Sequence, residues 1–143
     1  SMRSVVHQIY PRIMAGETIQ LFKSHRPDYA DGGQKRDFIY VKDCVDVILW
    51  MIENPFPSGL YNLGTGEART WLDLAEAVFA ASRRPAKIGF IDTPVEIRDK
   101  YQYFTQAAMS RLRAAGCGVN FHSLEVGVSD YVRTHLARED CYL

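Results

Sequence analysis

The chain has 143 residues, of which 47% are hydrophobic and 24% charged, and its 17 Lys and Arg residues balance 17 Asp and Glu residues. These proportions are typical of one soluble globular domain, and zero net charge argues against a nucleic-acid-binding protein. No apolar run reaches the roughly 20 residues of a membrane span, and no signal-peptide pattern opens the chain. The three cysteines lack Cys-x-x-Cys spacing and indicate neither a disulfide framework nor a zinc site. We expect a reduced, cytoplasmic protein that holds no metal ion.

The first elements in chain order are a helix, a strand and a loop. Apolar residues at helical spacing predict a helix from Val5 to Met14, which Gly16 ends and Pro11 kinks or shortens. A short strand at Ile19–Phe22 and a polar loop rich in Asp, Gly and Pro follow.

The middle of the chain alternates strand and helix signals. Asp37–Val41 is β-branched and aromatic and predicts a strand, after which Asp43 is a suitable N-cap. The helix that follows is apolar around much of its circumference as far as Asn54, so we expect it to be sandwiched between other elements. Leu60–Leu63 predicts another short strand before Gly64-Thr65-Gly66.

The remaining sequence continues the alternation. The further signals are a helix capped by Thr70, a strand at Lys87–Ile91, an extended segment at Tyr101–Phe104, a helix from Thr105 to Gly116, and a last helix capped by Ser123. Strands that alternate with helices predict an α/β fold with at least part of a parallel sheet.

Two segments carry candidate binding chemistry. Gly64-Thr65-Gly66 lies between a strand and a helix, but Arg69 occupies the third small position of a dinucleotide-binding loop, which favours a structural turn. Arg36 can donate two parallel hydrogen bonds to a phosphate, or it can pair with Asp37 or Asp43.

The sequence gives little sign of catalysis. The loop from Lys23 to Arg26 adds donors, although a solvated loop has the same composition, and His25 is the histidine least easily dismissed as structural. No nucleophile elbow and no acid–base carboxylate pair stands out.

Three segments together resemble one enzyme family. They are RDFIYVKD at 36–43, LYNLGTGEARTWLDLAEAV at 60–78 and KYQYFTQAAMSRLRAAG at 100–116. The first two are similar to nucleotide-sugar epimerases and dehydratases in general. The third narrows the resemblance to the ADP-L-glycero-D-manno-heptose 6-epimerases, which are extended short-chain dehydrogenase/reductases of the NAD-dependent epimerase/dehydratase family. The resemblance covers nearly the whole chain.

The resemblance implies that residues 1–143 are the C-terminal, substrate-binding portion of such an enzyme, an α/β fold without most of the Rossmann sheet. The N-terminal domain that holds NADP (or NAD) would be absent, because the glycine-rich loop is missing and no tyrosine has Lys four residues later. The parent would be an isomerase of lipopolysaccharide precursor biosynthesis that inverts C6 of an ADP-heptose by oxidation and reduction. We expect this chain alone to be inactive and to hold no cofactor, since hydride transfer is the cofactor's chemistry.

The family's substrate contacts carry over to a set of polar and aromatic residues. Gln8 stands where some members have a substrate-binding His. The full set is Ser1, Gln8, Phe22, Lys23, Ser24, His25, Arg36 and Tyr101.

Two other functions remain open. One is a fragment of a UDP- or dTDP-sugar epimerase or dehydratase, and the other is a non-catalytic nucleotide-binding or protein-interaction module. Strands cut from a larger sheet would leave unpaired edges and apolar surface, so we also expect self-association.

Overall fold

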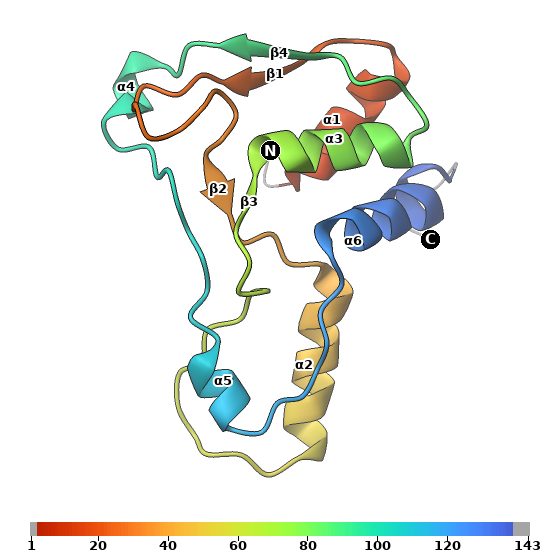
Figure 1. Ribbon diagram of the computed structural model, residues 1–143. Coiled ribbons are helices and arrows are strands. Elements are labelled where there is room, and N and C mark those ends of the chain that lie inside the picture. Colours follow the sequence, from red (N-terminus) through yellow and green to blue (C-terminus); the bar gives the residue numbers. More distant parts are fainter. Residues whose placement is uncertain (1–2, 139–143) are drawn as a thin grey trace.

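The computed structural model describes residues 3–138, and its helices and strands alternate as an α/β protein. In chain order the elements are α1 (Val5–Met14), β1 (Ile19–Phe22), β2 (Lys35–Arg36), α2 (Val41–Glu53), β3 (Arg69–Thr70), α3 (Trp71–Ala81), β4 (Ile88–Ile91), α4 (Val95–Arg98), α5 (Ser110–Ala114), α6 (Leu124–Tyr131) and the π-helical turn η1 (Val132–Leu136). Figure 1 shows α1, α3, β1, β4 and α6 at one end of the molecule, with α2 and α5 at the other.

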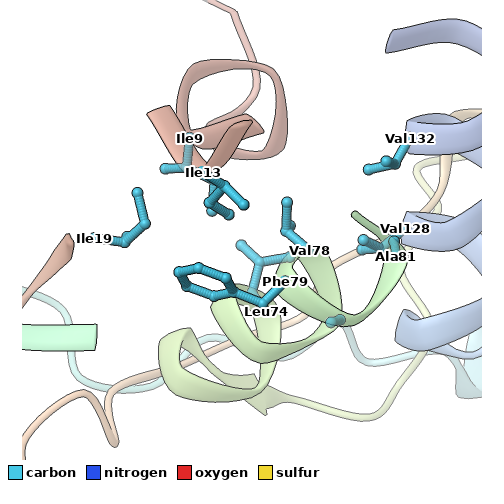
Figure 2. Close-up of a cluster of buried hydrophobic side chains, with 10 residues drawn as sticks. Ile9, Ile13, Ile19, Leu74, Val78, Phe79, Ala81, Val128 and Val132 are labelled. Atoms are coloured by element: carbon cyan, nitrogen blue, oxygen red, sulfur yellow. The ribbon is translucent and has the colours of Figure 1, made fainter. Parts of the chain in front are cut away.

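The larger core lies where α1, α3 and α6 meet. Ile13 of α1, Val78 of α3 and Val132 of η1 are each at most 1% exposed, and their side chains point toward one another (Figure 2).

The predicted N-cap of α3 is confirmed, because the Thr70 side chain accepts from Asp73 N–H while the Asp73 carboxylate accepts from Thr70 N–H. This capping box satisfies backbone donors that a helix N-terminus otherwise leaves unpaired.

Above this core, both predicted strands are confirmed as β1 and β4, which form a parallel pair with Ile19 opposite Ile88 and Phe22 opposite Ile91. The first predicted helix is confirmed as α1, and Gly16 ends it with a positive φ of 78°. The expectation that Pro11 shortens this helix is wrong, since α1 continues to Met14.

The predicted strand at Asp37–Val41 is wrong. The pairing strand is β2, which runs antiparallel to β3 and ends at Arg36. Asp37 leaves the ladder because its carboxylate accepts from the backbone N–H groups of Thr65, Gly66 and Ala107. Tyr40, in extended conformation, precedes α2, so the predicted N-cap Asp43 instead lies buried inside the first turn.

The expectation that α2 is sandwiched is also wrong for the part of the chain described here. Only Val47 of its apolar residues is buried, against Leu112 and Cys117 in a second, smaller core. Trp50 and Met51 are partly buried against this core, but five apolar side chains are exposed: Val41, Val45, Ile48, Leu49 and Ile52 are between 47% and 75% accessible. We call these five residues the α2 apolar face.

Two further predictions are wrong: the strand at Leu60–Leu63 and the long helix from Thr105. Leu60–Leu63 forms no strand, since no strand within residues 3–138 pairs with it, and Leu60 is 88% exposed. The helix expected from Thr105 is only α5, because Thr105 N–H donates to Lys35 O and Ala107 N–H to Asp37. The last helix begins at its predicted cap, Ser123.

Candidate functional site

The predicted binding loop begins at the carboxyl end of a parallel strand pair. Phe22 is the last residue of β1, and Lys23 N–H still donates to Ile91 O at the end of β4. The chain after each strand then stays adjacent, with Lys23 Nζ 3.3 Å from a carboxylate oxygen of Asp92. An ion pair this exposed contributes little to stability, so Lys23 is available to another anion.

Side chains from three other segments hold the backbone at 23–25. Ser24 N–H donates to Asp31 Oδ1 at 2.7 Å, and His25 N–H donates to Tyr103 Oη at 2.9 Å. Lys23 O accepts from Gln34 Nε2 and from Thr93 Oγ1. The loop therefore has one defined path, although no strand ladder imposes it.

The His25 ring has a defined orientation as well. Its Nε2 accepts from Thr93 N–H at 3.3 Å. In the neutral imidazole the proton then resides on Nδ1, where it can be donated to a ligand.

Arg36 lies at the end of β2 between two aromatic rings. Its guanidinium carbon is 5.5 Å from the centre of the Tyr101 ring and 6.0 Å from that of Trp71. One Arg36 nitrogen donates to Lys35 O. Among residues 3–138, no carboxylate forms an ion pair with it, so most of its donors remain available.

The alternative interpretation, an Arg36 paired with Asp37 or Asp43, does not match the geometry. The Asp37 carboxylate is occupied by the loop at Thr65 and Gly66. Asp43 is fully buried and accepts from both the backbone N–H and the ring Nδ1 of His122.

Tyr101 joins the loop to the arginine. Its ring meets the Phe22 ring edge to face, with centroids 5.8 Å apart. The Arg36 guanidinium group stacks on the same Tyr101 ring. Burial raises the pKa of the Tyr101 hydroxyl, although the positive charge of Arg36 opposes the shift. The hydroxyl thus stays protonated and can donate a hydrogen bond at neutral pH.

Most of the residues predicted as substrate contacts therefore come together in one place. We name this group the Arg36 cluster: Phe22, Lys23, Ser24, His25, Arg36 and Tyr101. It combines cationic donors with flat aromatic rings, which suits an anion attached to a planar group.

The two remaining residues of the predicted set are Ser1 and Gln8. Ser1 lies outside the described residues. Gln8 lies on α1, where its side chain donates to Arg3 O, and none of the contacts within residues 3–138 joins it to the Arg36 cluster.

The loop Gly64-Thr65-Gly66 is the structural turn that the sequence favoured. Its two backbone N–H groups at Thr65 and Gly66 form a cradle for an anion, and Asp37 of the same chain fills it. A Cβ on Gly64 would lie 2.5 Å from Asp37 Oδ2, which leaves no room for a further group. Burial would raise the pKa of Asp37, but the hydrogen bonds from Thr65, Ala107 and Gly66 hold that pKa below its usual value. The loop does not fit a dinucleotide pyrophosphate.

A cavity of about 630 Å³ lies elsewhere, between the start of α1, the segment 37–41, α3 and α6. Its lining includes apolar residues such as Val5, Phe38 and Leu74, with His7 and Tyr131 among the polar ones. No member of the Arg36 cluster lines it.

Sequence reasoning missed several residues that shape the Arg36 cluster. Asp31, Gln34 and Thr93 act through hydrogen bonds to loop backbone, and Trp71 through its stacking on Arg36. Only Tyr103 carried a signal, as the second tyrosine of the KYQYFTQA segment.

Residues 3–138 contain no group of three metal-ligating side chains and no helix long and apolar enough to cross a membrane.

Comparisons with known proteins find similar sequences and similar structures. A model of the NAD dependent epimerase/dehydratase family matches residues 1–64. An ADP-L-glycero-D-manno-heptose-6-epimerase of Nitratidesulfovibrio vulgaris is 54% identical over 99% of this chain. That alignment covers 44% of the relative, so the chain spans less than half the length of this curated protein.

Solved structures show the same fold. The Helicobacter pylori ADP-L-glycero-D-manno-heptose-6-epimerase has a TM-score of 0.75 and 24% identity, covering 96% of this chain and 39% of that one. A Thermus thermophilus UDP-glucose 4-epimerase, solved with NAD, has a TM-score of 0.66 and 24% identity over 87% of this chain and 37% of its own. The resemblance found in the sequence is confirmed: the chain matches the C-terminal part of an extended short-chain dehydrogenase/reductase epimerase.

Proposed function

We propose that this chain is the substrate-binding portion of a nucleotide-sugar epimerase whose preceding half holds NADP or NAD. The parent would invert C6 of ADP-glycero-manno-heptose by oxidation and reduction. The support is the 54% identity to a heptose epimerase over 99% of this chain, combined with coverage of only 44% of that relative. In this division the present residues bind and orient the substrate.

The observation that carries the proposal is the environment of Arg36. Its guanidinium is held between Tyr101 and Trp71, and no carboxylate within residues 3–138 competes for it. Lys23 and His25 offer further donors from a loop whose backbone is fixed. We assign the Arg36 cluster to the diphosphate and adjoining nucleoside of an ADP-sugar, because guanidinium groups bind phosphate with two parallel hydrogen bonds.

Calorimetric titration of the purified chain with ADP tests this assignment. We expect Arg36→Ala to weaken ADP binding about 10- to 100-fold, the loss of a charge-assisted hydrogen bond of about 1.5–3 kcal/mol. Arg12→Ala is the matched control, since Arg12 pairs on the surface with Glu17 and should leave affinity unchanged. Equal affinity in the two variants, or no ADP binding by the unaltered chain, would contradict the assignment.

The same titration distinguishes the alternatives. Tighter binding of UDP or dTDP than of ADP would favour a UDP- or dTDP-sugar enzyme. The Thermus thermophilus UDP-glucose 4-epimerase is an example of such an enzyme with this fold. Equal affinity for all three nucleotides would favour a non-catalytic nucleotide-binding module. Absence of binding to any of them would favour an interaction module.

We further propose that the chain alone does not catalyse the reaction. Its glycine-containing turn is filled by Asp37, and no tyrosine has Lys four residues later. An assay of the purified chain with ADP-heptose and added NADP should show no epimerisation. Turnover at a rate above that of a heat-denatured sample would refute the division of labour.

The α2 apolar face fits this proposal as a surface that the other half of the parent covers. Exposed apolar area of this extent on one helix is unusual for a complete soluble domain. Leu60 and Leu63, which belong to no strand within residues 3–138, are exposed as well.

A further inference from the structure

The Arg36 cluster is built from two parts of the chain that approach each other from different sheets. Phe22–His25 continues from β1 of the parallel pair, whereas Arg36 ends β2 of the antiparallel pair. Binding one ligand with both parts requires a fixed distance between them. The Tyr101 ring contacts both parts, and one further residue forms hydrogen bonds to both.

That residue is Tyr103, which binds one part through its backbone and the other through its side chain. Its carbonyl oxygen accepts from Lys35 N–H at 2.8 Å, next to Arg36, and Phe104 bridges to Lys35 in parallel. Its hydroxyl oxygen accepts from His25 N–H at 2.9 Å. The residue is only 7% exposed, so water has little access to compete for these two hydrogen bonds.

The rest of the ring is enclosed by the loop that joins the two parts. The Tyr29 ring lies 5.1 Å away between centroids, the Arg26 guanidinium carbon lies 5.1 Å from the Tyr103 ring centre, and the Tyr101 ring lies at 5.8 Å. Arg26 is in turn held by Asp28 at 2.6 Å. Tyr103 is therefore packed on several sides by aromatic rings and a guanidinium group.

We propose that Tyr103 is a positioning residue, which fixes the Phe22–His25 segment relative to Arg36 and so pre-organises the Arg36 cluster for a nucleoside diphosphate. This inference rests on the proposed function. Tyr103 acts through His25 and Lys35 and touches no phosphate itself. A loop held in its binding conformation loses less entropy when the ligand binds, so its affinity is higher.

Tyr103→Phe is the appropriate variant, because it removes the hydroxyl and keeps the ring and the backbone bond to Lys35. Tyr29→Phe is the matched control, since the Tyr29 hydroxyl has no hydrogen bond among the contacts within residues 3–138. Amide hydrogen exchange at His25 should become about tenfold faster in Tyr103→Phe and stay unchanged in Tyr29→Phe. ADP affinity by calorimetry should fall about three- to tenfold in Tyr103→Phe alone.

The two measurements separate the possible failures. If the unaltered chain binds no ADP, the proposed function fails, and the inference fails with it. If the chain binds ADP but His25 exchange is unchanged in Tyr103→Phe, the link through the hydroxyl is refuted. If exchange accelerates and ADP affinity does not change, Tyr103 is structural only and the positioning role is refuted.

Discussion

Removing the Asp37 carboxylate should loosen three segments at once. Its Oδ1 accepts from Thr65 N–H at 2.7 Å and from the Thr65 hydroxyl, while Oδ2 accepts from Gly66 N–H at 3.0 Å and Ala107 N–H at 2.9 Å. The side chain thereby joins the end of β2 to the turn before α3 and to the segment before α5. Asp37→Ala leaves three backbone donors without their partner.

The magnitude follows from these bonds. A hydrogen bond to a charged group contributes about 1.5–3 kcal/mol, but water can replace part of this set because Asp37 is only partly buried. We therefore expect the free energy of unfolding to fall by about 3 kcal/mol, roughly the value of one to two such bonds. With a urea m-value of about 1–3 kcal/mol/M, the unfolding midpoint should move down by about 1 M or more.

Urea titration followed by circular dichroism measures this shift. Asp37→Asn keeps one acceptor oxygen and should give an intermediate midpoint. Asp46→Ala replaces an exposed carboxylate of α2 and should change stability by no more than about 0.5 kcal/mol. A midpoint for Asp37→Ala equal to that of Asp46→Ala would refute the reasoning.

Two other predictions concern the link between α2 and α6 and the surface of α2. Hydrogen bonds from Lys42 and Tyr40 lower the pKa of Asp130 to about 2. Because the folded pKa lies below the ordinary value of 3.8, the stabilisation is fully present above about pH 4 and is lost as the pH falls toward 2. An NMR titration should find this low pKa in the unaltered chain and a higher one in Lys42→Met, and a normal pKa in both would contradict the contact. Light scattering should detect self-association of the chain through the α2 apolar face, which Ile48→Lys reduces and Val126→Lys on α6 does not. A monomeric unaltered chain would contradict that expectation.

The sequence predicted well those elements whose signals are local. Thr70 and Ser123 cap their helices through side-chain bonds to backbone three residues on, and Gly16 ends α1 with a positive φ. The strands β1 and β4 were also predicted from their β-branched and aromatic residues, although their pairing with each other was not.

The failures arise where a distant group overrides the local pattern. Residues 37–41 have strand composition, but the Asp37 side chain bonds to a turn 28 residues later and takes the segment out of the sheet. Thr105 resembles a helix cap, yet its N–H donates to Lys35. Hydrophobic periodicity contains no information about such contacts, because they join residues that lie far apart in the sequence.

The same limit applies to the candidate site. Motif resemblance identified Arg36, Tyr101 and the loop at Phe22–His25, and the structure gathers them. It could not identify Gln34 or Thr93, which contribute through backbone bonds that any polar residue of suitable length can make. Their role is visible only when the loop path is known.

The bond between His25 and Tyr103 has a consequence for synthesis. It joins residues 78 positions apart, and the strand partners Ile19 and Ile88 are nearly as distant. Closing so long a stretch of chain carries an entropic cost before any contact repays it, and such long-range pairings fold slowly. On the ribosome the helices α1, α2 and α3 are synthesised first, and the bond to His25 cannot form until Tyr103 leaves the exit tunnel. The Arg36 cluster therefore cannot be completed before Tyr101 and Tyr103 have been synthesised, although α5 and α6 follow later still.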